Sequence, residues 1–148
     1  IWTIDSNSSK VNELFMYLRD FADDYFKFSE INLFINSYPT DLPTLELEAH
    51  HIKELIPICK ELITNAYKHS IAKNIWFDFN IKEDDYLEIK IKDDGIGMEI
   101  GKIKPGNGMK NIESRVKRSN GKITFNSKTN EGTEVIFELK LPQQGSNS

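Results

Sequence analysis

The sequence predicts an α+β domain, a two-layer α/β sandwich in which helices cover one face of a mixed, mostly antiparallel sheet. Three segments place apolar residues at every third or fourth position, the spacing of amphipathic helices. Five other segments alternate apolar and polar residues, which is typical of strands that bury only one face. Because one-faced strands and one-striped helices bury each other, both patterns predict the same two layers.

The first half of the chain predicts a helix, a strand and a second helix. The first helix covers about 11–28 and the strand about 31–36. The second helix extends over about 48–70 and contains Pro57, which removes one backbone donor, so the helix either kinks at Pro57 or begins there. A kink is favoured because the apolar stripe keeps its phase on both sides of the proline.

The second half predicts four strands and a third helix. The helix covers about 109–119 and ends at Asn120 and Gly121, a common stop signal. The strands show a period of two residues and lie at about 75–81, 87–91, 123–125 and 135–141.

Composition limits the class of protein. The chain has 148 residues, of which 39% are hydrophobic and 28% charged, so it can bury one core and is not expected to be disordered. A net charge of −4 does not favour a nucleic-acid partner or direct contact with an anionic membrane. The single cysteine, Cys59, fits a reducing compartment. No apolar run approaches the roughly 20 residues of a membrane span, and the N-terminus does not read as a signal peptide.

A polar group on the second helix could carry chemistry. Glu61, Asn65, Lys68 and His69 follow a spacing of four, seven and eight residues, which places them on neighbouring points of one helix face. A carboxylate, an amide oxygen, an ammonium and an imidazole together suit a hydrated hard cation and phosphate oxygens. The alternative interpretation is a solvated helix edge.

Two glycine-containing segments could approach a ligand closely. Asp93, Gly95 and Gly97 follow the strand at 87–91, where the glycines allow a sharp turn and the carboxylate could accept a hydrogen bond from an exocyclic amine. A dinucleotide-binding loop is excluded because no helix follows directly, and the acidic pattern of a calcium loop is absent. An ordinary turn remains the alternative.

Gly106 and Gly108 come just before the third helix, so free backbone N–H groups there could bind an anion. The alternative is a flexible capped loop. Gly132 and Thr133 open the last strand and by themselves indicate only a turn.

Taken together, the order of these motifs is more specific. An E-x-x-x-N helix, D-x-G-x-G after a strand, G-x-G before a helix and G-T before a strand resemble the Bergerat ATP-binding fold over about residues 11–142. Gyrase, large heat-shock chaperones, mismatch-repair proteins and histidine kinases share that fold. N-A-Y-K-H, R-x-x-x-x-N-G-K-I and the ending F-E-L-K-L-P are similar to the catalytic domain of two-component sensor histidine kinases. The subgroup indicated is the one whose response regulators carry a helix-turn-helix domain.

The resemblance implies roles for the polar helix residues. Asn65 would coordinate Mg²⁺, and Glu61 would orient the metal shell or a water molecule. Lys68 and His69 would lie near the phosphates of ATP.

It also implies a pocket for the nucleotide. Asp93 would bind the adenine amino group, Gly95 and Gly97 would make room for the base, and Thr133 would support the pocket. Gly106 and Gly108 would wrap the phosphates as part of a mobile lid from about Met98 to Met109.

The implied activity is that of a protein-histidine kinase that binds ATP and Mg²⁺. It would donate the γ-phosphate to a histidine on a separate dimerisation domain of the same protein and act upstream of a response regulator. Residues 1–10 would be the linker from that missing domain, 11–142 the ATPase domain and 143–148 a disordered tail. The isolated chain would be monomeric and inactive for autophosphorylation. The parent would be a homodimer, with this domain in the cytoplasm of a sensor that is membrane-anchored in some cases.

Two other functions stay open. An anti-sigma-factor serine kinase uses the same nucleotide-binding fold, and a degenerate domain retained as a scaffold would not bind ATP. Other residues have plainer interpretations: Cys59 belongs to the core, and Trp76 faces the other side of its strand. His50 and His51 are expected to be exposed rather than metal ligands, because no cysteine or carboxylate is spaced for zinc.

Overall fold

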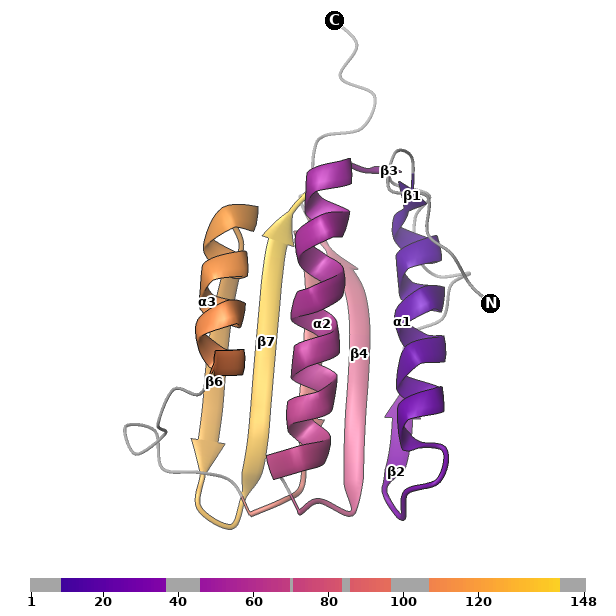
Figure 1. Ribbon diagram of the computed structural model, residues 1–148, viewed down its shortest axis with the longest axis vertical. Helices are drawn as coiled ribbons and strands as arrows, with labels where there is room; N and C mark the ends of the chain where they lie inside the picture. The colour runs from indigo at the N-terminus through magenta and orange to yellow at the C-terminus, as the bar shows by residue number, and fades with distance from the viewer. Residues whose placement is uncertain (1–8, 37–45, 70, 84–85, 97–106, 142–148) are drawn as a thin grey trace, which may run out of the picture.

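The structure is a computed structural model and describes residues 9–36, 46–69, 71–83, 86–96 and 107–141. Within these ranges, three helices lie on one face of a five-stranded sheet (Figure 1). The helices are α1 (Val11–Phe26), α2 (Ala49–His69) and α3 (Asn107–Ser119). The strands of the sheet are β2 (Asn32–Ile35), β4 (Asn74–Lys82), β5 (Tyr86–Asp93), β6 (Lys122–Lys128) and β7 (Gly132–Lys140).

The strand order β2-β4-β5-β7-β6 confirms a mixed, mostly antiparallel sheet. Only β2 and β4 run parallel among the described strands, and the chain between them includes α2, as a parallel connection requires a crossover. The pairs β4–β5, β5–β7 and β6–β7 are antiparallel. No helix within the described ranges is long and apolar enough to cross a membrane.

The core lies between the sheet and the three helices. Phe77, Phe79, Ile89 and Phe137 alternate along β4, β5 and β7 and are at most 1% exposed. They meet the apolar stripes of α1 and α2, as expected from the periodicity. Cys59 is buried in this core as predicted, and burial raises the pKa of its thiol to about 12.

An aromatic pair lies on the outer face of the sheet. Trp76 on β4 stacks against Phe34 on β2 with ring centroids 5.8 Å apart, and Phe34 is 45% exposed. Trp76 therefore lies on the outer face of its strand, as the alternation predicts.

α2 runs through Pro57 without interruption, so the alternative that the helix begins at the proline is wrong. Pro57 has no backbone N–H, so the carbonyl of Lys53, four residues earlier, has no donor within the helix. Lys53 is exposed, so water can satisfy this carbonyl.

The structure differs from the prediction at two places. α3 begins at Asn107 rather than near Met109. A second sheet of two strands, β1 (Ser9–Lys10) and β3 (Glu46–Leu47), pairs the start of α1 with the start of α2. Strands of two residues have no periodicity, so their pairing could not be read from the sequence.

An ion-pair cluster fastens α3 to α2. The carboxylate of Glu54 on α2 accepts hydrogen bonds from Arg115 at 3.2 Å and from Arg118 at 3.1 and 3.3 Å, both on α3. The Glu54 side chain is only 11% exposed. The hydrogen bonds from Arg118 are the largest cause that lowers the pKa of Glu54 below its ordinary value.

We expect Glu54→Gln to lower the free energy of unfolding by about 1–2 kcal/mol, because it leaves two arginines without their anion. The pKa of Glu54 is lower in the folded chain than in the unfolded chain, so the ion pairs stabilise the fold fully at pH values above the ordinary carboxyl pKa. This stabilisation is lost as the pH falls through the lowered pKa of the folded chain. The difference between variant and parent should therefore shrink in acid. Urea unfolding at several pH values measures it, and Glu113→Gln on the exposed side of α3 is the matched control. Equal stability of the two variants at neutral pH would contradict the role of the cluster.

Candidate functional site

Asp93 lies at the end of β5, on the face of the sheet that the helices cover. It follows Leu87, Ile89 and Ile91 in the inward alternation, yet it is a carboxylate and is only 5% exposed. The backbone N–H of Gly95 donates to its Oδ1 at 2.9 Å. Burial raises the pKa of Asp93 above its ordinary value, although backbone N–H groups of Gly95 and Thr133 oppose this. A buried acceptor of this kind can recognise a ligand that brings a donor into an otherwise apolar pocket.

Asp94 holds the turn after β5 against the beginning of β4. Its Oδ1 accepts from the backbone N–H groups of Lys73 and Asn74, both at 2.9 Å, and its Oδ2 accepts from the side-chain amide of Asn74 at 2.8 Å. Burial alone would raise the pKa of Asp94, but the hydrogen bonds from Asn74 and Lys73 outweigh it and hold that pKa below its ordinary value.

Sequence reasoning assigned no role to Asp94. The available signal was the doubled aspartate at a strand end, since aspartate readily accepts backbone hydrogen bonds in turns. Its partners lie about 20 residues upstream, and no local pattern identifies them.

Gly132 brings the beginning of β7 against Asp93. Its φ is 81°, a conformation that favours glycine, and a Cβ there would collide with the backbone carbonyl of Asp93. Thr133 is the register partner of Asp93, and its hydroxyl lies 2.8 Å from that of Ser127 on β6. The G-T pair is therefore a point of close backbone contact as well as a turn.

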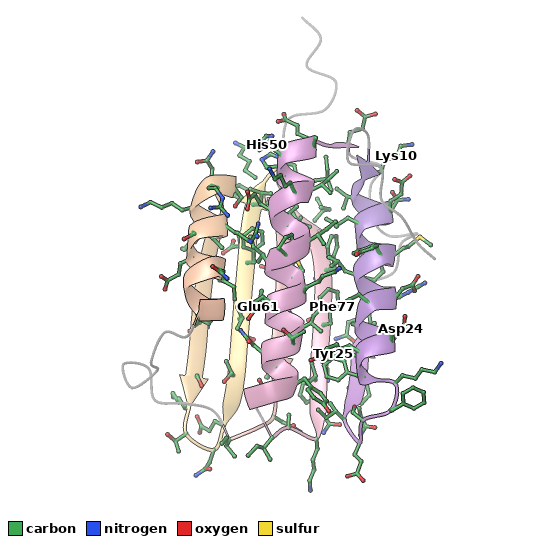
Figure 2. The ribbon with its side chains drawn as sticks, viewed as in Figure 1. Lys10, Asp24, Tyr25, His50, Glu61 and Phe77 are labelled. Carbon is green, nitrogen blue, oxygen red and sulfur yellow. The ribbon has the colours of Figure 1, made fainter. Side chains whose placement is uncertain are left out.

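α2 presents a polar stripe toward α3. Glu54, which pairs with the arginines of α3, precedes Glu61 by two helical turns and Asn65 by three, so the three side chains share one side of the helix. Figure 2 shows Glu61 on this side. The side chains of Glu61 and Asn65 are half-buried. Lys68 and His69 lie in the last turn of α2, and their side chains are outside the described residues.

The topology brings the motifs to one end of the domain. α2 ends at His69 and β4 begins at Asn74, which Asp94 binds, so the C-terminal half of α2 lies at the end of the sheet that carries Asp93 (Figure 1). Gly132 starts β7 at this end, whereas α3 starts partway along the sheet, with its N-terminal turn on the side of this end (Figure 1). The C-terminal half of α2, with Glu61 and Asn65, therefore lies toward the end of the domain that carries Asp93, Gly95 and Thr133.

Several predicted residues are only partly placed. Gly97, Met98 and Gly106 lie outside the described residues. Gly108 and Met109 lie in the first turn of α3, whereas the sequence placed Gly108 before the helix and Met109 at its start. The helix N-terminus remains a favourable place for an anion, because its first N–H groups have no partner within the helix.

A hollow of about 270 Å³ adjoins Asp93 and Thr133. Its other walls come from β6 and from the residues just before and within β7, among them Asn126, Lys128 and Glu131. It does not reach Glu61 or Asn65. We therefore define the candidate site by the shared position of its residues rather than by this hollow.

The prediction for the histidine pair at the start of α2 is wrong in part. His50 is exposed as expected, but His51 is only 8% exposed. A carboxylate is also present, because Nδ1 of His50 lies 3.2 Å from Oε2 of Glu48.

Comparison with known proteins identifies the family of the chain. The family model described as histidine kinase-, DNA gyrase B- and HSP90-like ATPase matches residues 50–143. The sensor histidine kinase YdfH of Bacillus subtilis is 37% identical over 91 residues, which cover 60% of this chain and 22% of YdfH. The nitrate/nitrite sensor protein NarQ of Escherichia coli is 34% identical over 100 residues, which cover 67% of this chain and 18% of NarQ. The chain thus spans about a fifth of the length of these relatives.

The fold is also found in a solved structure. The histidine kinase domain of the blue-light activated histidine kinase from Erythrobacter litoralis EL346 superposes with a TM-score of 0.74. The superposition covers 96% of this chain and 67% of that one at 14% identity, which shows a common fold. Because the family model matches more than half of the residues, from the start of α2 to beyond β7, this chain belongs to the family of histidine kinase-, DNA gyrase B- and HSP90-like ATPases.

Proposed function

We propose that this chain binds Mg·ATP where α2, β5, β7 and the start of α3 meet, and that it donates the γ-phosphate to a histidine on a separate domain. The observation that carries the proposal is the buried carboxylate of Asp93 at the same end of the sheet as Glu61 and Asn65. Family membership adds that related domains are ATPases.

Asp93 would recognise the adenine base. Its carboxylate lies on the covered face, and Asp94 and Gly132 fix the backbone on either side of it. An adenine amino group could donate to this carboxylate, whereas guanine presents a carbonyl at the corresponding position. Gly95 and Gly97 would leave room for the base, and Thr133 would support the pocket from β7.

Glu61 and Asn65 fit a magnesium ion. Both supply oxygen atoms, both are half-buried, and they lie one turn apart on the same side of α2. Asn65 would be the ligand, with Glu61 orienting the metal shell or a water molecule. The ion would neutralise phosphate charge, while Lys68 and His69 would lie near the phosphates.

The segment from Met98 to Met109 would form the lid over the phosphates. Gly106 and Gly108 would let its backbone approach them, and the start of α3 at Asn107 would add N–H donors. No nucleophile is required in this domain, because the attacking histidine would lie on the separate domain and ADP would be the leaving group; the role of this domain would be positioning and charge neutralisation.

The names of the relatives support a sensor kinase over an anti-sigma-factor kinase. In that setting, residues 1–10 would be a linker from a dimerisation domain of the same protein, and 143–148 a tail after the ATPase domain of 11–142. The downstream partner would be a response regulator of the helix-turn-helix subgroup. The domain would lie in the cytoplasm, and the parent protein would be a homodimer.

We expect Asp93→Asn to weaken ATP binding by about 1–3 kcal/mol, because an amide spoils the match between donor and acceptor in a buried site. Calorimetric titration of ATP and GTP into both forms measures this and should show a smaller preference for ATP in the variant. Asp78→Asn, on the outer face of β4, is the matched control. Equal ATP affinity of Asp93→Asn and the parent would contradict the proposal that Asp93 binds the adenine amino group.

We expect Asn65→Ala to weaken Mg·ATP binding far more than binding of ATP in excess chelator, because only the first needs the metal ligand. Asn111→Ala, on the exposed side of α3, controls for loss of an amide. Titration with and without Mg²⁺ gives both affinities, and thermal unfolding checks the fold. An equal loss under both conditions would assign Asn65 a structural role.

We expect the 148-residue chain to bind Mg·ATP, as a monomer, without labelling itself. His50 and His51 lie in the first turn of α2 and His69 in its last turn, so none can reach an in-line position without unwinding the helix that forms the site. Incubation with γ-labelled ATP, followed by acid and base stability tests, measures this. A dimerisation domain added in cis should restore labelling outside residues 1–148, and acid-labile label on the chain alone would overturn the proposal.

A further inference from the structure

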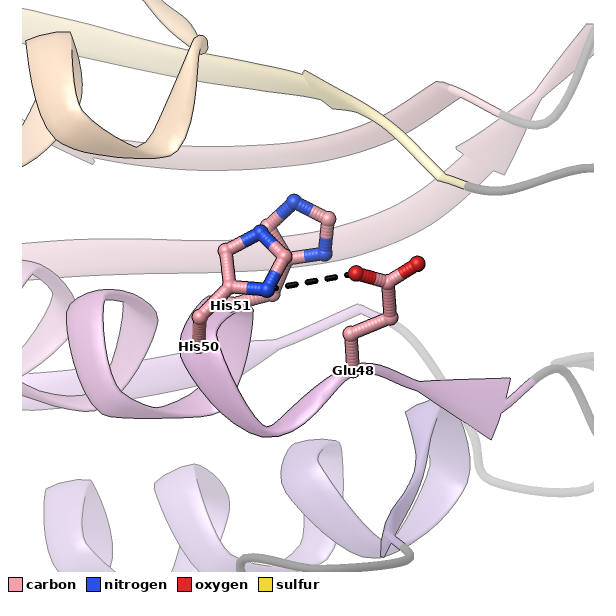
Figure 3. A group of neighbouring side chains, drawn as sticks. All are labelled: Glu48, His50 and His51. Carbon is pink, nitrogen blue, oxygen red and sulfur yellow. Dashed lines mark ion pairs between the residues drawn. The ribbon is translucent and has the colours of Figure 1, made fainter.

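We infer that Glu48, His50 and His51 form a binding site for a nitrogen-preferring divalent metal ion such as Zn²⁺. The three residues supply one carboxylate oxygen and two imidazole nitrogens, and the ligand atoms all lie within 4.8 Å of one another. Figure 3 shows the two rings beside each other, with the Glu48 carboxylate next to both.

The backbone gathers these residues into one turn. The carbonyl of Glu48 accepts from the N–H of His51 at 3.0 Å and from that of Ile52 at 3.2 Å, which makes Glu48 the N-cap residue that directly precedes α2. The rings of His50 and His51 lie 4.0 Å apart between centroids. Neighbours along a helix usually diverge, so this closeness depends on the first-turn geometry and on the packing of His51.

His51 provides the independent indication of a ligand. It is 92% buried, and its Nδ1 has no hydrogen-bond partner among the described residues. A buried polar atom without a partner is costly, so native structures satisfy almost all of them. A neutral imidazole that carries its proton on Nε2 presents a lone pair at Nδ1, and a metal ion can accept that pair.

The spacing fits zinc. Ligands about 2.0–2.1 Å from a tetrahedral zinc ion are roughly 3.3 Å apart. Nδ1 of His50 and Oε2 of Glu48 are 3.2 Å apart. The side chains of His50 and Glu48 are 58% and 55% exposed, so they can rotate to close the set around the buried ring. Two imidazoles and one carboxylate favour Zn²⁺ over Mg²⁺, which prefers oxygen, and leave a fourth position for water.

This site is distinct from the proposed nucleotide site. His50 precedes Asn65 by 15 residues of one helix, or about 22 Å along its axis. The positive end of the helix dipole repels a cation at this position, and the negative charge of the Glu48 carboxylate offsets that repulsion. Glu48 directly follows β3, so a bound ion would link the end of β3 to the first turn of α2. Because β3 pairs with β1, the ion would also restrict the motion of the two-stranded sheet that precedes α1 and α2.

The test uses the 148-residue chain without a histidine tag, in chelator-treated buffer and without nucleotide. Competition with a chromophoric zinc chelator should give one Zn²⁺ per chain, and zinc should raise the thermal unfolding midpoint. Co²⁺ should give a four-coordinate visible spectrum without a thiolate band, because Cys59 is fully buried.

Three variants test the ligands. His50→Ala and Glu48→Gln change exposed side chains, so they should keep the fold, and His51→Gln tests the buried ring. Each should weaken zinc binding at least about tenfold, since even outer-shell losses cost about 10–100-fold. Glu113→Gln, on the exposed side of α3, is the matched control and should bind zinc like the parent. Absence of 1:1 binding, unchanged affinity in Glu48→Gln and His50→Ala, or loss of binding in Glu113→Gln would each overturn the inference.

Discussion

The carboxylate of Asp94 holds together two stretches of chain that are distant in sequence, and the candidate site depends on that contact. It accepts the N–H groups of Lys73 and Asn74, where the chain has just left α2, and it sits directly after β5. This contact adds to the backbone hydrogen bond from the N–H of Asp94 to the carbonyl of Asn74 and to the pairing of β4 with β5. Gly132 completes the junction from the other side, because its backbone lies against the carbonyl of Asp93 where no Cβ could fit.

α2 links stability to the candidate site through one polar stripe. In its first half, Glu54 binds the arginines of α3. Glu61 lies two turns further along the same side of α2 (Figure 2), and Asn65 follows it by one turn. The same helix carries the buried His51 in its first turn, so its two ends present different ligand chemistries.

Much of the fold could be predicted because the periodic spacing of apolar residues is a strong signal of secondary structure. The five strands of the main sheet and the three helices were each visible as alternation or as a 3–4 spacing. The two-residue strands β1 and β3 escaped prediction, since pairing between such short segments depends on tertiary position. The start of α3 was placed two residues late, as glycines near a helix end obscure its boundary.

For the site, the sequence by itself determined which chemical groups are available and on which elements they lie: an E-x-x-x-N helix face, a carboxylate at a strand end and glycines at the turns. The burial of Asp93 was not predicted, because the predicted strand ended at 91, whereas β5 continues its inward alternation to Asp93. Tertiary structure decided the rest. Only the folded chain brings Asp94 to Asn74 and Gly132 to Asp93, and only packing buries His51 beside Glu48. The physical reason is that periodicity reports which side of an element is apolar, whereas these contacts depend on where elements far apart in the sequence meet.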